Sequence, residues 1–152
     1  MVYLTKEIKE YYMNDFTNNV VNCSDEFWDL DEGLLEICTD INKNDNVQTL
    51  YSRRCLKDND ENNISFLWIM ISEQADTDKI NTFIRTCKRQ HKFFTFVPTK
   101  MEVNGLEPSI KINAMQDINY FQHGVIVVKI DSNKLKEHNL FWETIERHIK
   151  NW

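Results

Sequence analysis

Residues 64–72 read ISFLWIMIS, a run in which the only polar residues are the two serines. Short runs rich in Ile, Phe and Trp are typical of buried strands, whereas a helix needs a longer periodic pattern. The polar loop KDNDENN at 57–63 separates this run from VQTLYSRRCL at 47–56, which also reads as a strand. We therefore expect a hairpin whose second strand lies centrally in a sheet and is covered on both faces.

Further elements are predicted on both sides of this hairpin. Apolar residues at helical spacing predict helices at about 4–16, 24–41, 76–92 and 134–152, the last being one helix or two short ones. Alternating segments predict strands at 93–103, 106–115 and 120–130. The order α-α-β-β-α-β-β-β-α predicts an α+β fold, with a mostly antiparallel or mixed sheet of about five strands and helices packed on it.

The dipeptide Asn104-Gly105 between two alternating segments predicts a β-hairpin with a two-residue turn. That turn would pair Val103 with Leu106 and Met101 with Pro108, and this register places apolar partners on one face of the hairpin.

Length and composition predict one folded domain over residues 1–152. The chain has 152 residues, 41% of them hydrophobic, and its formal net charge is −6. A chain of this size buries roughly 68–70% of its unfolded surface, enough for a self-supporting core. The negative charge argues against non-specific DNA binding and against binding to anionic membranes, and it favours a basic partner.

The cysteines and the N-terminus favour the cytoplasm. The four cysteines form no C-x-x-C pair, which argues against a zinc ribbon or a thioredoxin-like site, and we expect free thiols in a reducing compartment. The start MVYLTKEIKEYYMNDF has no signal-peptide pattern, and no apolar run approaches the ~20 residues of a membrane span. Abundant Asn, Lys, Ile and Asp favour an AT-rich source such as a virus, a mobile element or a low-GC microbe.

A line of carboxylates is predicted along the helix at 24–41. At about 100° per residue, five acidic residues fall in one narrow sector opposite the apolar residues of that helix: Asp25, Asp29, Glu32, Glu36 and Asp40. Like charges four residues apart cost about 0.2–0.5 kcal/mol per pair, so the arrangement invites an explanation.

A second, basic line is predicted on the helix at 76–92. Arg85, Lys88, Arg89 and Lys92 are spaced i, i+3, i+4 and i+7, beside the apolar side of that helix. Two structural interpretations apply to both lines: each is a solvated helix face, or the two face each other inside the fold.

The functional hypothesis that we favour is a small acidic binding protein rather than an enzyme. The acidic helix would engage a basic protein partner such as a nuclease toxin, as an inhibitor or immunity protein does. Charge complementarity would come from Asp25, Asp29, Glu32 and Glu36, and Trp28 would be the aromatic anchor. The comparison with inhibitors and immunity proteins is one of surface chemistry.

Two alternatives stay open. The segment KRQHKFFTFV interleaves cations with aromatic residues, as single-stranded nucleic-acid sites do. A nucleic-acid-binding or nucleic-acid-processing protein would then use Arg85, Lys88, Arg89, Lys92 and Phe94. The other alternative is a subunit of a larger assembly.

No catalytic motif is detectable in the sequence. Metalloprotease, phosphate-loop, dinucleotide-binding and nucleophile-elbow patterns are all missing, and three glycines would hardly build a phosphate cradle. We therefore predict no cofactor and no metal. His123, before Gly124 at a strand start, and the cysteines are the residues that a spatially assembled active site would use.

Overall fold

The computed structural model describes residues 3–17, 33–90, 95–104, 107–112 and 124–152. Its helices are α1 (Lys6–Phe16), α2 (Leu34–Asn42), α3 (Thr77–Gln90) and α4 (Leu135–Ile149). Its strands are β1 (Val47–Arg53), β2 (Ile64–Ile71), β3 (Thr95–Asn104), β4 (Glu107–Ile112) and β5 (Val125–Asp131). The predicted mixed α+β class is confirmed, and the C-terminal segment forms one helix.

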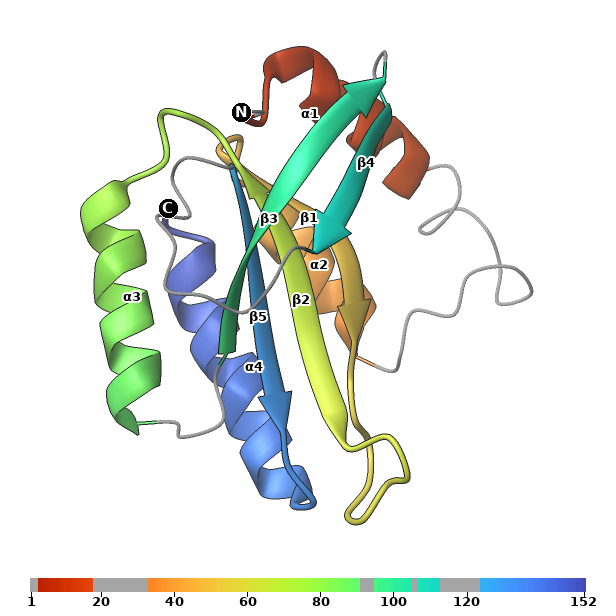
Figure 1. Cartoon of the computed structure of the whole chain (residues 1–152), viewed down its shortest axis with the longest axis vertical. Coiled ribbons are helices and arrows are strands. Elements are labelled where there is room, and N and C mark those ends of the chain that lie inside the picture. Colours follow the sequence, from red (N-terminus) through yellow and green to blue (C-terminus); the bar gives the residue numbers. More distant parts are fainter. Residues whose placement is uncertain (1–2, 18–32, 91–94, 105–106, 113–123) are drawn as a thin grey trace.

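The described strands are paired antiparallel throughout. The order across the sheet is β1-β2-β5-β3-β4, so β2 lies between β1 and β5 (Figure 1). The central position predicted for β2 is therefore confirmed.

The β3–β4 hairpin has a different register from the predicted one. Val103 pairs with Pro108 and Asn104 with Glu107, so Asn104 belongs to the paired part of the hairpin and not to its turn. The predicted pairing of Met101 with Pro108 is therefore wrong by two positions. Because side chains alternate with a period of two, a slip of two residues keeps the same sets of residues on each face, which explains why the apolar pattern did not reveal the error.

Helices α2, α3 and α4 cover one face of the sheet (Figure 1). The odd-numbered residues Leu67, Ile69 and Ile71 of β2 lie in the core on that side and are at most 1% exposed. The helices contribute their own buried side chains to this core: Leu34, Ile37, Ile41, Ile80, Phe83, Phe141, Trp142, Ile145 and Ile149. The same residues give each helix its apolar side, so the periodicity predicted this layer correctly.

Helix α1 lies at one end of the opposite face. Leu4 and Ile8 pack there against Met70 of β2, with Leu50 partly buried beside them. The Thr5 side chain accepts a hydrogen bond from the Ile8 N–H and caps the helix.

Lys9 ties α1 to the other elements. Its Nζ donates hydrogen bonds to the backbone carbonyls of Asn42 at 2.7 Å, Asn44 at 3.2 Å and Val47 at 2.5 Å. These carbonyls belong to the end of α2 and the turn into β1, where helical carbonyls lack intrahelical donors. One cation on α1 therefore holds α1 at the end of α2 and the start of β1.

Candidate binding surfaces

Helix α2 is shorter than the acidic helix predicted at 24–41. It begins at Leu34, because Gly33 before it has φ +83°, a left-handed conformation that ends any continuous helix through this point. A Cβ atom at position 33 would lie 2.4 Å from Nη1 of Arg54, so only glycine fits there without a shift of that side chain. A single helix through 24–41 is therefore wrong at Gly33, and the line of five carboxylates does not continue along one helix.

The proposed acidic site is only partly within the described residues. Asp25, Trp28, Asp29 and Glu32 lie outside them. Glu36 is exposed on α2, opposite the buried residues of that helix. Asp40 forms an ion pair of 3.0 Å with Lys43, so that carboxylate is partly neutralised.

The basic stripe is also described in part. Arg85 is exposed on α3, and its Nη2 lies 3.4 Å from the Thr82 hydroxyl, which accepts from it. Lys88 and Arg89 lie within the bounds of α3, but their side chains are outside the described ones. Lys92 and Phe94, like His123, lie outside the described residues altogether.

The two charged stripes do not face each other where they are described. Helix α4 lies between α2 and α3 and packs against both (Figure 1). No ion pair between described side chains joins α2 to α3. The interpretation that the stripes form an internal contact is therefore wrong for Glu36 and Arg85, which are both exposed.

The sheet presents a second surface that the sequence analysis did not identify. In β2, Phe66 and Trp68 point away from the helix layer, because they alternate with the buried Leu67 and Ile69. Both are only partly buried, whereas Met70 on the same face is 0% exposed, so the prediction that β2 is covered on both faces is confirmed at Met70 and holds only in part at Phe66 and Trp68. Helix α1 reaches Met70 at one end of this face.

Neighbouring strands complete this surface in register. Trp68 is paired with Tyr51 of β1 and Val127 of β5, and Phe66 is paired with Arg53 of β1 and Lys129 of β5. Directly paired residues of an antiparallel sheet project to the same face. We call these six residues the open face, of which Val127 is buried, at 3% exposed, and contributes no accessible area.

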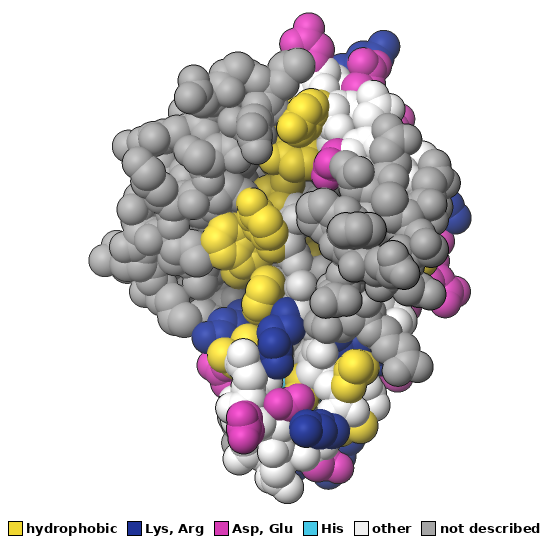
Figure 2. Space-filling view, turned by 90° about the vertical axis from the view of Figure 1, so that its right-hand side faces the viewer, with side chains coloured by type: hydrophobic (Ala, Val, Ile, Leu, Met, Phe, Trp, Pro, Cys, Tyr) yellow, Lys and Arg dark blue, Asp and Glu magenta, His cyan; other side chains and the backbone are white. Residues whose placement is uncertain are grey.

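The open face combines exposed aromatic area with positive charge. Tyr51 is 58% exposed and its ring meets the Trp68 ring edge-to-face, with centroids 5.5 Å apart. Figure 2 shows a band of hydrophobic side chains running down this side of the molecule, with Lys and Arg side chains directly below the band. The sequence contains a signal for this surface in residues 64–70. The aromatic residues Phe66 and Trp68 alternate with the aliphatic residues Leu67 and Ile69, so the two kinds of residue lie on opposite faces of β2.

A serine–histidine pair lies in the core and not at a surface. His138 of α4 accepts at Nδ1 from the Ser65 hydroxyl at 2.7 Å and donates from Nε2 to the Ser132 carbonyl at 2.7 Å. Ser65 in turn accepts from the Cys55 N–H at 3.0 Å. The carbonyl of Ser132 can only accept, which fixes the proton on Nε2 and leaves Nδ1 as the acceptor. Because Ser65 and His138 are both 0% exposed, no substrate reaches them, and the pair is a structural connection between β2 and α4.

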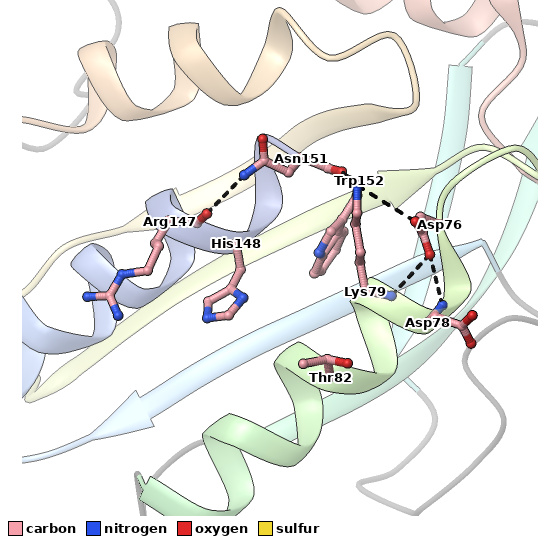
Figure 3. Close-up of a pocket in the computed structure, with 8 residues that line it drawn as sticks. All are labelled: Asp76, Asp78, Lys79, Thr82, Arg147, His148, Asn151 and Trp152. Carbon is pink, nitrogen blue, oxygen red and sulfur yellow. Dashed lines mark hydrogen bonds and ion pairs between the residues drawn. The ribbon is translucent and has the colours of Figure 1, made fainter.

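A cavity of about 460 Å³ opens between α3 and the end of α4 (Figure 3). Asp76 accepts from the N–H groups of Asp78 and Lys79 at 3.1 Å each, which caps α3. Lys79 donates from Nζ to the Asn151 carbonyl at 3.1 Å and lies 3.7 Å from Asp76. Lys79 therefore joins α3 to the C-terminal end of the chain.

His148 forms another side of this cavity. Its ring lies 5.4 Å from the Phe83 ring, and its pKa is lowered by burial and then by the neighbouring Arg147. In the described parts of the chain, no group of three or more His, Cys, Asp or Glu side chains is arranged to hold a metal ion. The cavity carries no nucleophile–base pair, so its geometry supports no specific reaction.

Comparison with protein-family models, with curated proteins and with solved structures gives no match. Among the helices within the described ranges, none has the length and apolar character needed to cross a membrane.

Proposed function

We propose that this protein is a small acidic binding protein that engages a basic protein partner, as an inhibitor or immunity-type factor. The observation that carries the proposal is the sorting of side chains on α2. Leu34, Ile37 and Ile41 are buried in the core, and Glu36 on the opposite side is exposed. The segment before Gly33 carries Asp25, Asp29 and Glu32 with Trp28 among them, which adds charge and an aromatic anchor.

The fold around Gly33 supports this arrangement. Gly33 is left-handed directly before α2, so α2 begins at Leu34 and presents Glu36 in its first turn. Together with the acidic residues that precede Gly33 in the sequence, this carboxylate would attract a basic site, and electrostatic attraction of this kind raises association rates.

The proposed location is the cytoplasm. Cys38 and Cys55 are free and buried, as expected in a reducing compartment. Burial raises the pKa of the Cys38 thiol to about 11, so this thiol is a packing group and not a nucleophile.

We also propose that the five described strands are the whole sheet of the protein, in the chain order α-α-β-β-α-β-β-β-α. The support is the continuous set of pairings from β1 through β2, β5 and β3 to β4.

The test is a charge reversal with a matched control. The partner is isolated from the source organism by affinity capture. Its association rate is then measured for the variant Asp29→Lys, Glu32→Lys, Glu36→Lys. The control changes three exposed acids elsewhere by the same total charge: Glu10→Lys, Glu61→Lys and Glu143→Lys.

We expect the first variant to associate at least about 10-fold more slowly at low salt, and the control to stay close to wild type. Equal slowing of both variants would show that only net charge matters and would refute the acidic site.

A second candidate function is nucleic-acid binding through Arg85, Lys88, Arg89, Lys92 and Phe94. The observation that favours it is the exposure of Arg85 on α3. It predicts affinity for single-stranded RNA or DNA that falls steeply with salt and is weakened by Arg85→Gln.

A further inference from the structure

We propose that the open face of the sheet binds single-stranded nucleic acid, with bases stacked on its aromatic rings and phosphates at its cations. The ligand class is that of the second candidate function, but the surface is different and the proposal does not depend on α3 or on the acidic segment.

The aromatic row supplies the stacking platform. Tyr51 lies on β1 at the edge of the sheet and is 58% exposed, and Trp68 beside it is partly buried. Their interplanar angle of 86° is an edge-to-face contact, which occupies one face of one ring and leaves the other ring faces out of this contact. An uncovered ring face on an exposed edge is what base stacking requires, and it accepts any base because every base has a π-face.

The adjacent row supplies positive charge. Phe66 is flanked in register by Arg53 and Lys129, so one ring lies between two cations. Rows two residues apart along a strand are separated by roughly 7 Å, so a base on the aromatic row can have its phosphate near the cation row.

The guanidinium of Arg53 is held by neutral acceptors. Its Nε donates to the Ile64 carbonyl at 3.3 Å and its Nη2 to the Asn62 carbonyl at 3.1 Å. These contacts fix the group without cancelling its charge, so it keeps its attraction for a phosphate.

Lys129 has an ion-pair partner with which a bound phosphate would compete. Its Nζ lies 3.4 Å from the Asp131 carboxylate, and its side chain is 26% exposed. A phosphate must compete with that carboxylate for the ammonium group. Removal of the carboxylate should therefore strengthen binding, an effect that a purely structural role of this face would not produce.

The charge pattern favours nucleic acid over an apolar partner. An apolar peptide or a second copy of the chain would have to desolvate the Arg53 guanidinium, which is held by backbone carbonyls, without a counter-charge, which is unfavourable. A polyanion with flat apolar bases complements both rows of the open face.

The experiment uses the full chain and fluorescent oligo-dT and oligo-U probes of about 12 nucleotides, a length within the range of single-strand site sizes. Anisotropy is measured between about 20 and 200 mM salt. We expect Tyr51→Ala to weaken binding about 10-fold or more, because stacking on one ring is lost. Arg53→Gln should weaken binding and reduce the slope of log affinity against log salt by about 0.7, the contribution of one phosphate contact.

Asp131→Asn should tighten binding by up to about fivefold, the range expected for removing an exposed competing ion pair. The matched controls are Leu140→Ala, which truncates an exposed apolar residue on α4, and Lys136→Gln, which removes an exposed cation on the same helix. Neither control should change affinity by more than about twofold. Circular dichroism and thermal melting confirm that every variant is folded.

Three outcomes would overturn the proposal. One is no binding of either probe by the wild type at low salt. Another is binding that Arg85→Gln weakens and Tyr51→Ala does not, which would place the site on α3. The third is a wild-type dimer in sedimentation equilibrium that Tyr51→Ala makes monomeric, without an effect on the probes, which would make the open face an interface between copies.

Discussion

The two faces of β2 are built from one run of sequence and differ in almost every physical respect. On the helix side, Leu67, Ile69 and Ile71 are sealed by three helices. On the other side, Phe66 and Trp68 are only partly buried and have cations or a tyrosine as cross-strand partners. Both sets are apolar, so hydrophobicity alone does not distinguish them.

Size and shape separate the two faces. The helix side carries aliphatic residues that interlock with helix side chains, and the open face carries planar rings that leave area uncovered. Aliphatic residues gain most of their free energy from complete burial and close packing. A partly exposed aromatic ring can still bind a ligand, because its face stacks on other rings and attracts cations. We infer that the helix side provides stability and that the open face is available for binding.

The largest expected effect tests the helix side directly. Leu67→Ala should lower the free energy of unfolding by about 2–5 kcal/mol, because Leu67 is 0% exposed and its removal leaves a cavity. Tyr51→Ala on the open face should cost less than about 1 kcal/mol, since 58% of the side chain is already in water. Urea unfolding followed by circular dichroism measures both. Similar costs for the two variants would remove the distinction between the faces.

The sequence predicts one of these faces much better than the other. Periodicity located the helices and the central strand because burial imposes a regular apolar pattern on each element. It did not show that one face of β2 stays partly open, because Phe66 and Trp68 are as apolar as residues that are fully covered.

The error at Gly33 has a different cause. The pattern of charged and apolar residues continues across Gly33, and this pattern outweighed the single glycine when the helix at 24–41 was predicted. Glycine in a helix interior costs about 1 kcal/mol relative to alanine, and here it is left-handed, at a place where a Cβ atom would make a close contact with the Arg54 side chain. That contact joins residues distant in sequence, so no local pattern contains it. The same holds for the pairing of Arg53 with Phe66 and Lys129, which depends on strand register.

A second prediction concerns the polar group on the helix side. Ser65→Ala should lower the free energy of unfolding by about 2 kcal/mol, because the Cys55 N–H and His138 Nδ1 both lose their partner inside the core. The control Thr82→Ala changes an exposed hydroxyl on α3 and should cost less than about 0.5 kcal/mol. If the two variants unfolded at the same urea concentration, the buried hydrogen-bond chain would have no role in joining β2 to α4.

A third prediction concerns the anchor of α1, the helix that closes one end of the open face. Burial lowers the pKa of Lys9 to about 8, and the Asp45 carboxylate opposes this shift. The unfolded chain keeps its proton up to about pH 10.4, so between pH 8 and that value the unfolded state binds more protons and stability rises with pH. Relative to Lys9→Met, the wild type should therefore gain about 1 kcal/mol over this interval, a figure reduced for solvent screening because the side chain is partly exposed.

The measurement for Lys9 is the difference in free energy of unfolding between wild type and Lys9→Met at pH 7.5, 9 and 10. The difference cancels the titration of tyrosines and of other lysines. Lys6→Met, an exposed lysine on the same helix, is the control and should show no such trend. A difference that shrinks with rising pH would mean that the three carbonyl contacts outweigh burial and hold the ammonium charged.

The smallest expected effect lies at the margin of the helix-covered side, where His148 contacts Phe83 and the cavity between α3 and α4. Burial and then Arg147 lower the pKa of this imidazole, so the unfolded chain takes up the proton first as pH falls. Stability should therefore decline from about pH 7 to pH 5, by less than about 0.5 kcal/mol because the ring is only partly buried and solvent screens it. Arg147→Gln removes the second cause and should raise the midpoint of the His148 ring titration followed by NMR. Lys136→Gln makes the same charge change at the far end of α4 and should leave the midpoint in place. A shift of equal size in both variants would mean that net charge governs this imidazole, and that even the edge of the covered side behaves as open surface.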